Sequence, residues 1–120
     1  MFDTRISISI SDNMRLTEIK SSKGQDLLSG LIRIHILYHA CKEPIFGLGM
    51  IEELQRHGYK LSAGTLYPML HGLERRGLLC SKKTRLGRRG RRVYRATATG
   101  RKALARAREK VKLLLGELLE

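Results

Sequence analysis

The segment TRLGRRGRRVYR, residues 84–95, contains six arginines and two glycines but no acidic residue. Guanidinium groups suit both phosphate oxygens and the narrow minor groove of DNA. Clustered like charges repel one another unless an anion neutralises them. The segment therefore predicts contacts with a polyanion. We expect its contacting residues to be Arg85, Arg88, Arg89, Arg91 and Arg92.

A second group of residues has the spacing of metal ligands. His35 and His39 are four residues apart, and Cys41 follows closely. His35 falls in an apolar segment, however, and no third or fourth ligand stands at motif spacing, so we expect no metal and no cofactor. The chain also contains no recognisable nucleophile motif, paired-carboxylate pattern or phosphate-binding loop. We therefore expect that it is not an enzyme.

The composition bounds the class of protein. A chain of 120 residues predicts one domain. Its 24 Lys and Arg against 11 acids give a net charge of +13, and residues 82–112 hold fourteen basic residues and one acid. The two isolated cysteines indicate a reducing compartment. Cys80 is expected to be a small buried side chain. With no signal peptide and no apolar run long enough to span a membrane, we expect a cytoplasmic protein that binds nucleic acid.

Apolar periodicity predicts a series of elements that would position the arginines. Residues 1–24 are read as an arm or linker, although the Ile-Ser alternation at Ile6, Ile8 and Ile10 also fits a strand. The expected helices are 25–42, 47–57 and 62–77, the expected strands are 78–84 and 92–98, and a last helix begins at Thr99 or Gly100. This order predicts a mainly α fold with a small β-hairpin, the architecture of a winged helix-turn-helix. We assign residues 25–98 to this DNA-binding domain and residues 99–120 to a C-terminal dimerisation helix.

The first and last helices carry more apolar surface than one small domain covers. Leu28, Leu31 and Ile32 lie on a helix that is apolar over much of its circumference. In the last helix, apolar residues recur at spacings of three and four, the pattern of a helix-packing seam. These are Leu104, Ala107, Val111, Leu114 and Leu118. We expect both sets to form a homodimer interface.

The third helix, residues 62–77, is expected to read DNA. Leu66, Leu70 and Leu73 mark its buried face. Ser62 is a candidate N-cap, and Pro68 requires either a start near Thr65 or an early kink. We expect the outward residues to contact DNA, with the alternatives of base contact or packing left open for His71. The outward residues are Ser62, Thr65, Tyr67, Pro68, His71 and Arg75.

The same helix resembles the signature of the PadR family of transcriptional regulators. Ser62, Gly64, Thr65, Leu66, Tyr67 and Pro68 match the core of that signature, and the match continues through His71, Leu73, Glu74, Gly77 and Leu78. Tyr94, Thr97 and Gly100 match its later Y-x-x-T-x-x-G pattern. The resemblance covers about residues 27–119. Ala63 and Leu48 depart from it, replacing the usual proline and tyrosine.

The resemblance implies a dimeric regulator, which we expect to be a repressor that binds a palindromic operator in double-stranded DNA. Many proteins of this resemblance respond to a small-molecule effector; here none is identified, and the chain has no Trp for an aromatic drug pocket. Three alternatives stay open. They are an architectural protein that binds nucleic acid without reading its sequence, a module that binds an acidic protein, and a metal- or redox-responsive regulator on the same fold.

Overall fold

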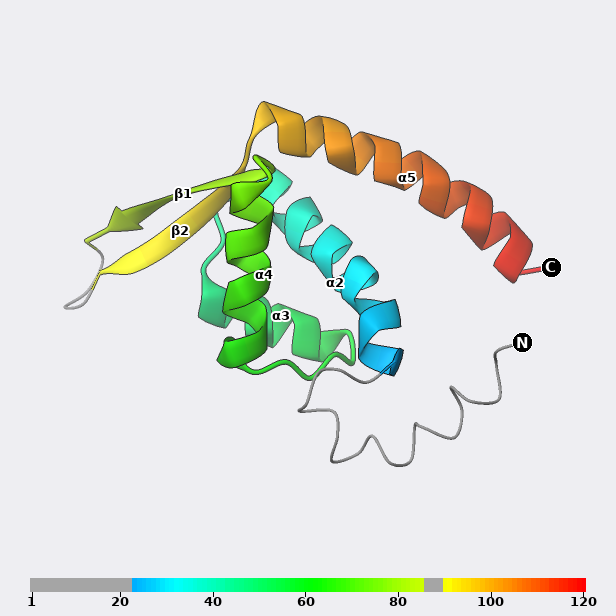
Figure 1. Cartoon of the computed structure of the whole chain (residues 1–120), viewed down its shortest axis with the longest axis horizontal. Helices are drawn as coiled ribbons and strands as arrows, with labels where there is room; N and C mark the ends of the chain where they lie inside the picture. The colour runs from blue at the N-terminus through cyan, green and yellow to red at the C-terminus, as the bar shows by residue number, and fades with distance from the viewer. Residues whose placement is uncertain (1–22, 86–89) are drawn as a thin grey trace. The chain divides into compact units, whose positions relative to one another are not determined.

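The structure is a computed structural model that describes residues 23–85 and 90–120. Within these residues the elements are α2 (Lys23–Lys42), α3 (Gly47–Arg56), α4 (Ala63–Arg75), β1 (Leu79–Thr84), β2 (Arg91–Ala96) and α5 (Ala98–Leu118) (Figure 1). The predicted fold class and the predicted element order are thus confirmed. The Ile-Ser segment lies outside the described residues, so both readings of it stay predictions.

The chain divides into two compact units, residues 1–33 and 34–120, and the boundary falls within α2. The second unit contains the end of α2 and all later elements. Its core is apolar and draws on every element except most of α5. The buried side chains are Ile36, Leu37 and Ala40 of α2; Ile45; Met50 and Leu54 of α3; Leu66, Leu70 and Leu73 of α4; and Leu79, Val93, Tyr94 and Ala96 of the hairpin.

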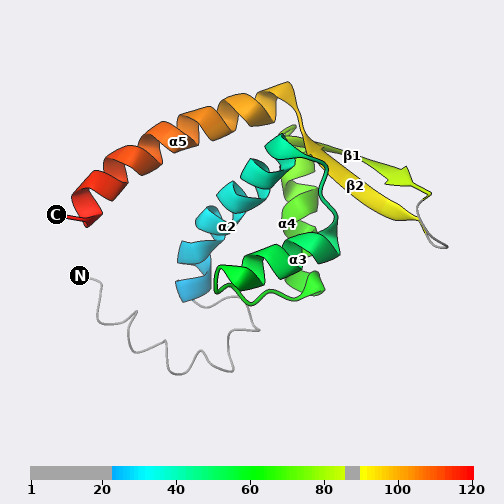
Figure 2. The ribbon, with the colours of Figure 1, turned by 180° about the vertical axis from the view of Figure 1, so that it is seen from behind.

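The core positions predicted for α3 and α4 are confirmed. Leu54, Leu66 and Leu70 are completely buried, and burying one leucine side chain contributes about 1.5–3 kcal/mol. Figure 2 shows α3 lying beside α4, with the hairpin leading away from the end of α4. Left-handed glycines end both helices, because Gly58 has φ +90° and Gly77 has φ +80°.

Two expectations concern the start of α4. Ser62 occupies the N-cap position with an extended backbone, but its side chain caps no amide and instead lies 3.4 Å from the Thr65 hydroxyl. The helix begins at Ala63, directly after Ser62, which excludes the alternative of a start near Thr65 and leaves Pro68 inside the helix. Proline lacks the N–H that would bond the carbonyl four residues earlier. That carbonyl belongs to Gly64, an exposed residue, so water can reach it.

The hairpin is antiparallel and its register runs from Leu79 opposite Ala96 to Thr84 opposite Arg91. Gly90 closes the described part of its turn with φ +67°, and a Cβ atom there would lie 2.8 Å from the Thr84 carbonyl oxygen. Two hydrogen bonds of 2.9 Å pair Ile45 with Tyr94, so the connection between α2 and α3 extends the sheet. The expectation that Cys80 is buried is wrong. In the register it stands opposite Arg95, which is also exposed.

The last helix begins one or two residues earlier than predicted, because Thr97 caps it. The Thr97 hydroxyl accepts the Gly100 N–H at 2.9 Å and donates to the Gly77 carbonyl at 2.6 Å. Gly100 packs so tightly that a Cβ atom would lie 2.1 Å from the Leu78 carbonyl oxygen. Arg101 adds a 3.1 Å hydrogen bond to the Cys41 carbonyl. These contacts attach the first turn of α5 to the ends of α2 and α4.

Candidate nucleic-acid interface

The predicted DNA-contacting residues of α4 lie away from its buried leucines. Ser62, Pro68, His71 and Arg75 are exposed, whereas Thr65 and Tyr67 are half-buried. The first turns of α3 and α4 contain no acidic residue, so the positive ends of both helix dipoles are unopposed there. This face of α4 therefore presents hydroxyl groups, an imidazole and a guanidinium group.

Tyr67 has a packing role that sequence reasoning missed. Its hydroxyl lies against the first residue of α3, because a Cβ atom on Gly47 would be 2.1 Å from that oxygen. The His71 ring lies 6.3 Å from the Tyr67 ring, between centroids, and His71 remains exposed. Tyr67 thus packs α4 against the start of α3, and its side chain is half-buried.

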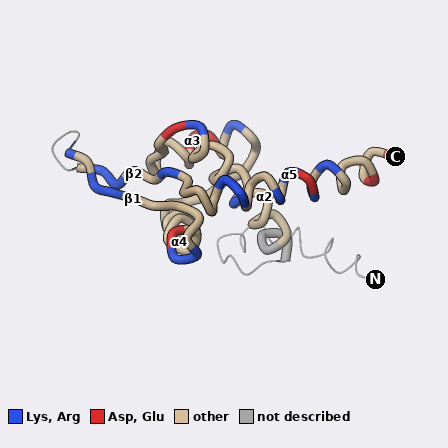
Figure 3. Tube along the Cα trace, turned by 90° about the horizontal axis from the view of Figure 1, so that it is seen from above, with Lys and Arg blue, Asp and Glu red and all other residues tan. Residues whose placement is uncertain are grey.

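The hairpin is basic along both strands and contains no Asp or Glu (Figure 3). Arg85, Arg91 and Arg92 are exposed. The Arg91 guanidinium lies 4.8 Å from the centroid of the Phe46 ring, a cation–π contact beside the start of α3. Arg88 and Arg89 lie outside the described residues.

One acidic residue stands beside these arginines. Glu74 on α4 accepts a hydrogen bond from the Ser81 hydroxyl on β1, whose oxygen is 3.0 and 2.9 Å from the two carboxylate oxygens. Arg92 on β2 donates to the same Ser81 oxygen at 3.1 Å. Nearby, the Tyr94 hydroxyl is buried and has no hydrogen-bond partner among the described residues. Burial, and secondarily the Glu74 charge, raise the pKa of Tyr94.

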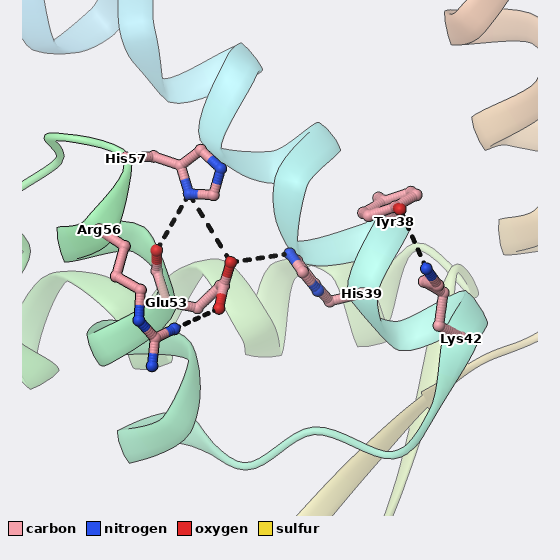
Figure 4. Close-up of polar contacts among 6 residues, drawn as sticks. All are labelled: Tyr38, His39, Lys42, Glu53, Arg56 and His57. Carbon is pink, nitrogen blue, oxygen red and sulfur yellow. Dashed lines mark hydrogen bonds and ion pairs between the residues drawn. The ribbon is translucent and has the colours of Figure 1, made fainter.

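His39 of α2 and His57, which follows α3, both lie beside the Glu53 carboxylate of α3 (Figure 4). The Glu53 carboxylate lies 3.6 Å from His39 Nε2 and 3.7 Å from His57 Nδ1, and it also pairs with Arg56. The ring centroids of His35 and His57 are 4.6 Å apart. Burial, and then the neighbouring His57 and His39, lower the pKa of His35.

These residues do not have the arrangement of a metal site. In the part of the chain that the structure describes, no group of three or more His, Cys, Asp or Glu residues could hold a metal ion. The His39 imidazole is paired with Glu53, and the backbone carbonyl of Cys41 accepts a hydrogen bond from Arg101.

Exposed apolar side chains lie on α2 and, separately, on α5. On α2, Leu28 is 42% exposed and Leu31 is 46% exposed, but Ile32 is buried. On α5, Leu104 and Ala107 are half-buried, and every residue from 108 to 120 is exposed. The exposed fractions of Val111, Leu114 and Leu118 are 37%, 51% and 70%. The described residues of one chain therefore leave most of the predicted dimer interface uncovered.

Comparison with known proteins places these features in a family. Residues 36–106 match the model of the transcriptional regulator PadR-like family. The chain belongs to the PadR-like family. The match contains α3, α4, the hairpin and the first turns of α5, so the resemblance inferred from the third-helix signature is confirmed. PadR-like proteins are transcriptional regulators that bind DNA.

Individual relatives agree with this assignment. The chain is 49% identical over 88 residues to the transcriptional regulator Rv3488 of Mycobacterium tuberculosis, which covers 73% of this chain and 82% of that protein. The crystal structure of a PadR family regulator from Eggerthella lenta matches with a TM-score of 0.70 at 33% identity, covering 89% of this chain and 97% of that one. A PadR-like regulator from Bacillus cereus, at 24% identity and a TM-score of 0.68, shows the same fold over 79% and 97% of the two chains.

The fold is thus the winged helix-turn-helix of PadR-like regulators, and the β1–β2 hairpin is called the wing from here on. Among the described residues, none of the helices is long and apolar enough to cross a membrane.

Proposed function

We propose that this PadR-like protein is a dimeric repressor that binds a specific palindromic DNA sequence in the cytoplasm. The observation that carries the proposal is the distribution of charge around α4 and the wing. Between Glu53 and Glu109 the only acidic residue is Glu74, and its carboxylate is hydrogen-bonded to Ser81. A surface of this kind attracts the phosphate backbone of DNA.

In the proposed complex α4 enters the major groove. Ser62, Thr65 and His71 supply donors for base edges or phosphates, and Arg75 reaches the backbone. Pro68 adds an exposed apolar surface on the same helix. Tyr67 acts in the complex chiefly by holding α4 against α3, since its hydroxyl packs on Gly47.

The wing arginines contact the DNA that flanks this groove. Arg85, Arg91 and Arg92 are exposed. Arg88 and Arg89 are included because they lie between these residues in the sequence. Their guanidinium groups bind phosphates or enter a narrow minor groove. Most of these contacts add affinity without reading the sequence, so we assign base recognition to α4 and additional affinity to the wing.

A second copy of the chain covers the exposed leucines in this proposal. Leu28 and Leu31 of α2 and the apolar residues of α5 are its contacts; Ile32 is left out because it is already buried. Large contiguous apolar patches are rare on the surfaces of monomeric proteins. A two-fold dimer presents two recognition helices about 34 Å apart, which requires half-sites about one helical turn apart. Occupation of such a site within a promoter represses transcription by excluding the polymerase.

The test begins by selecting bound duplexes from a random DNA library. The selected duplex and a shuffled duplex of equal length are then titrated over a range of salt concentrations. We expect a palindrome to be enriched and to bind at least about a thousandfold more tightly than the shuffled DNA at physiological salt. Equal affinity for the two duplexes at every salt concentration would reject sequence-specific regulation. That result would favour the architectural alternative, which the net charge of +13 also supports.

A further inference from the structure

Glu74 and Ser81 join the recognition helix to an exposed arginine of the wing through two hydrogen bonds. The carboxylate is on α4, the hydroxyl is on β1 and the guanidinium group is on β2, so three elements meet at one hydroxyl oxygen. We propose that Glu74 and Ser81 are positioning residues for DNA recognition: they hold Arg92 in a fixed place relative to α4, and thereby set the phosphate that the wing contacts when α4 lies in its groove. This inference rests on the proposed function and deepens it.

The chemistry of the three groups fixes the direction of both bonds. A guanidinium group can only donate and a carboxylate can only accept. The Ser81 oxygen therefore accepts from Arg92 at 3.1 Å and gives its single proton to Glu74 at 2.9–3.0 Å. Each bond involves one charged partner, which makes it stronger than a bond between neutral groups. The hydroxyl is thus a directional link between a cation and an anion.

The register of the hairpin explains why these residues meet. Ser81 stands opposite Tyr94, and Lys83 stands opposite Arg92. Because side chains alternate along a strand, Ser81 and Arg92 lie on the same face of the hairpin as the buried Tyr94. Ser81 and Glu74 are half-buried, whereas Arg92 is exposed. The arginine that extends to the surface is therefore anchored from the side of the sheet that packs on α4.

Anchoring Arg92 favours a correctly placed phosphate over other phosphates. A free arginine side chain has about 2 kcal/mol of rotamer entropy, part of which is lost when it binds DNA. The bond to Ser81 uses one of its five N–H groups and leaves the others available. Preorganisation lowers the cost of binding where the phosphate lies in the anchored position. In a nonspecific complex the arginine acts mainly as a mobile charge, so anchoring adds little.

The test uses the full chain, the duplex selected from the random library and its shuffled control. Ser81→Ala removes the link without changing the charge. We expect it to weaken binding to the selected duplex by about fivefold to tenfold, and to the shuffled duplex by less than about twofold. Ser81→Thr retains the hydroxyl on a residue that suits a strand, and should restore discrimination. Thermal unfolding of each variant shows whether the fold is intact.

A charge-matched pair separates position from electrostatics. Glu74→Ala and Glu52→Ala remove the same charge, but only Glu74→Ala also removes the acceptor of Ser81, since Glu52 is an exposed residue of α3. Both should bind shuffled DNA slightly more tightly, whereas only Glu74→Ala should lower the ratio of specific to shuffled affinity. An equal ratio for Ser81→Ala and the unmodified folded protein would overturn the proposal. An equal loss on both duplexes would also overturn it, because the link would then serve only to keep the wing attached.

A measurement without DNA keeps this inference separate from the proposed function. In protein with ¹⁵N-labelled arginine, rotation of the Arg92 guanidinium group should be slow in the unmodified chain and in Ser81→Thr, and fast in Ser81→Ala. Fast rotation in all three would refute the anchoring itself. If rotation follows this pattern but the library yields no enriched sequence, the proposed function fails while the anchoring stands.

Discussion

Replacing Gly100 by alanine tests the junction between the wing and α5. The new Cβ atom would lie 2.1 Å from the Leu78 carbonyl oxygen, 3.0 Å from the carbon of that carbonyl and 3.3 Å from a Leu37 methyl group. The nearest atom belongs to the backbone and cannot swing aside as a side chain does. The first turn of α5 must therefore move by at least about 1.3 Å to reach an ordinary van der Waals separation.

The expected cost follows from the contacts that this movement disturbs. Overpacking costs about 1–3 kcal/mol, and loss of the Thr97 cap, whose oxygen accepts the Gly100 N–H at 2.9 Å, adds about 1 kcal/mol. The sum is about 2–4 kcal/mol of unfolding free energy. For a domain of this size 1 kcal/mol corresponds to roughly 4–8 °C, so the melting temperature should fall by at least about 8 °C.

Gly72→Ala is the matched control for this measurement. Gly72 lies inside α4, and the nearest atom to its new Cβ would be the end of the Arg75 side chain at 3.9 Å, an ordinary contact. Alanine favours a helix over glycine by roughly 0.5–1 kcal/mol, so this variant should be more stable than the unmodified protein. Urea and thermal unfolding of both variants at equal protein concentration provide the comparison. A Gly100→Ala protein as stable as the unmodified one would refute the close packing described at this junction.

Three further outcomes are expected. The lowered pKa of His35 means that the unfolded chain takes up a proton more readily than the folded one, so the free energy of unfolding should fall as the pH drops below about 6.5. The urea midpoints measured at pH 7.5 and at pH 5.5 should differ less in His35→Gln than in the unmodified protein. An unchanged difference would assign the pH dependence to other groups. Replacing Arg88, Arg89, Arg91 and Arg92 together by alanine should reduce DNA affinity. It should also lower the magnitude of the slope of log affinity against log salt by up to about 3.6, since each phosphate contact contributes about 0.9. If both the affinity and the slope are retained, the wing does not contact DNA. Leu114→Glu places a charge on an exposed apolar face of α5 and should convert the proposed dimer to a monomer in sedimentation analysis, whereas a protein that is monomeric before the change would exclude this interface.

Most of the architecture followed from patterns within single elements. The leucines of α4 repeat with helical spacing, and the structure buries all three that this spacing indicated. The alternation in the hairpin and the glycines that end α3 and α4 likewise predicted elements whose ends differ by no more than about two residues from those observed. These properties depend on neighbours along the chain, so the sequence displays them directly.

The contacts that reasoning from the sequence missed join residues that are distant along the chain. Tyr67 packs on Gly47, Tyr94 pairs with Ile45, and Thr97 bonds the Gly77 carbonyl. No local pattern indicates which partner such a residue finds. The same limit applies to Cys80, because the usual burial of a free cysteine does not show which side chains of the strand the rest of the domain covers.

The candidate site was predictable by residue type more than by role. Arginines without acidic neighbours indicated a surface for a polyanion, and Arg85, Arg91 and Arg92 are exposed as that reading requires. Tyr67 was expected at the surface as a hydroxyl donor, but it is half-buried against α3. A functional role of Glu74 was not predicted from the sequence, since its link to Arg92 depends on a serine in a different element.

Hydroxyl-radical footprinting on the selected duplex tests the central claim most directly, because it shows at once whether two copies hold one site and where they touch it. The account predicts two protected half-sites with centres about 10 base pairs apart, and further protection of the flanking DNA that disappears in the four-arginine variant. Protection spread evenly along the duplex, or confined to a single half-site, would contradict it.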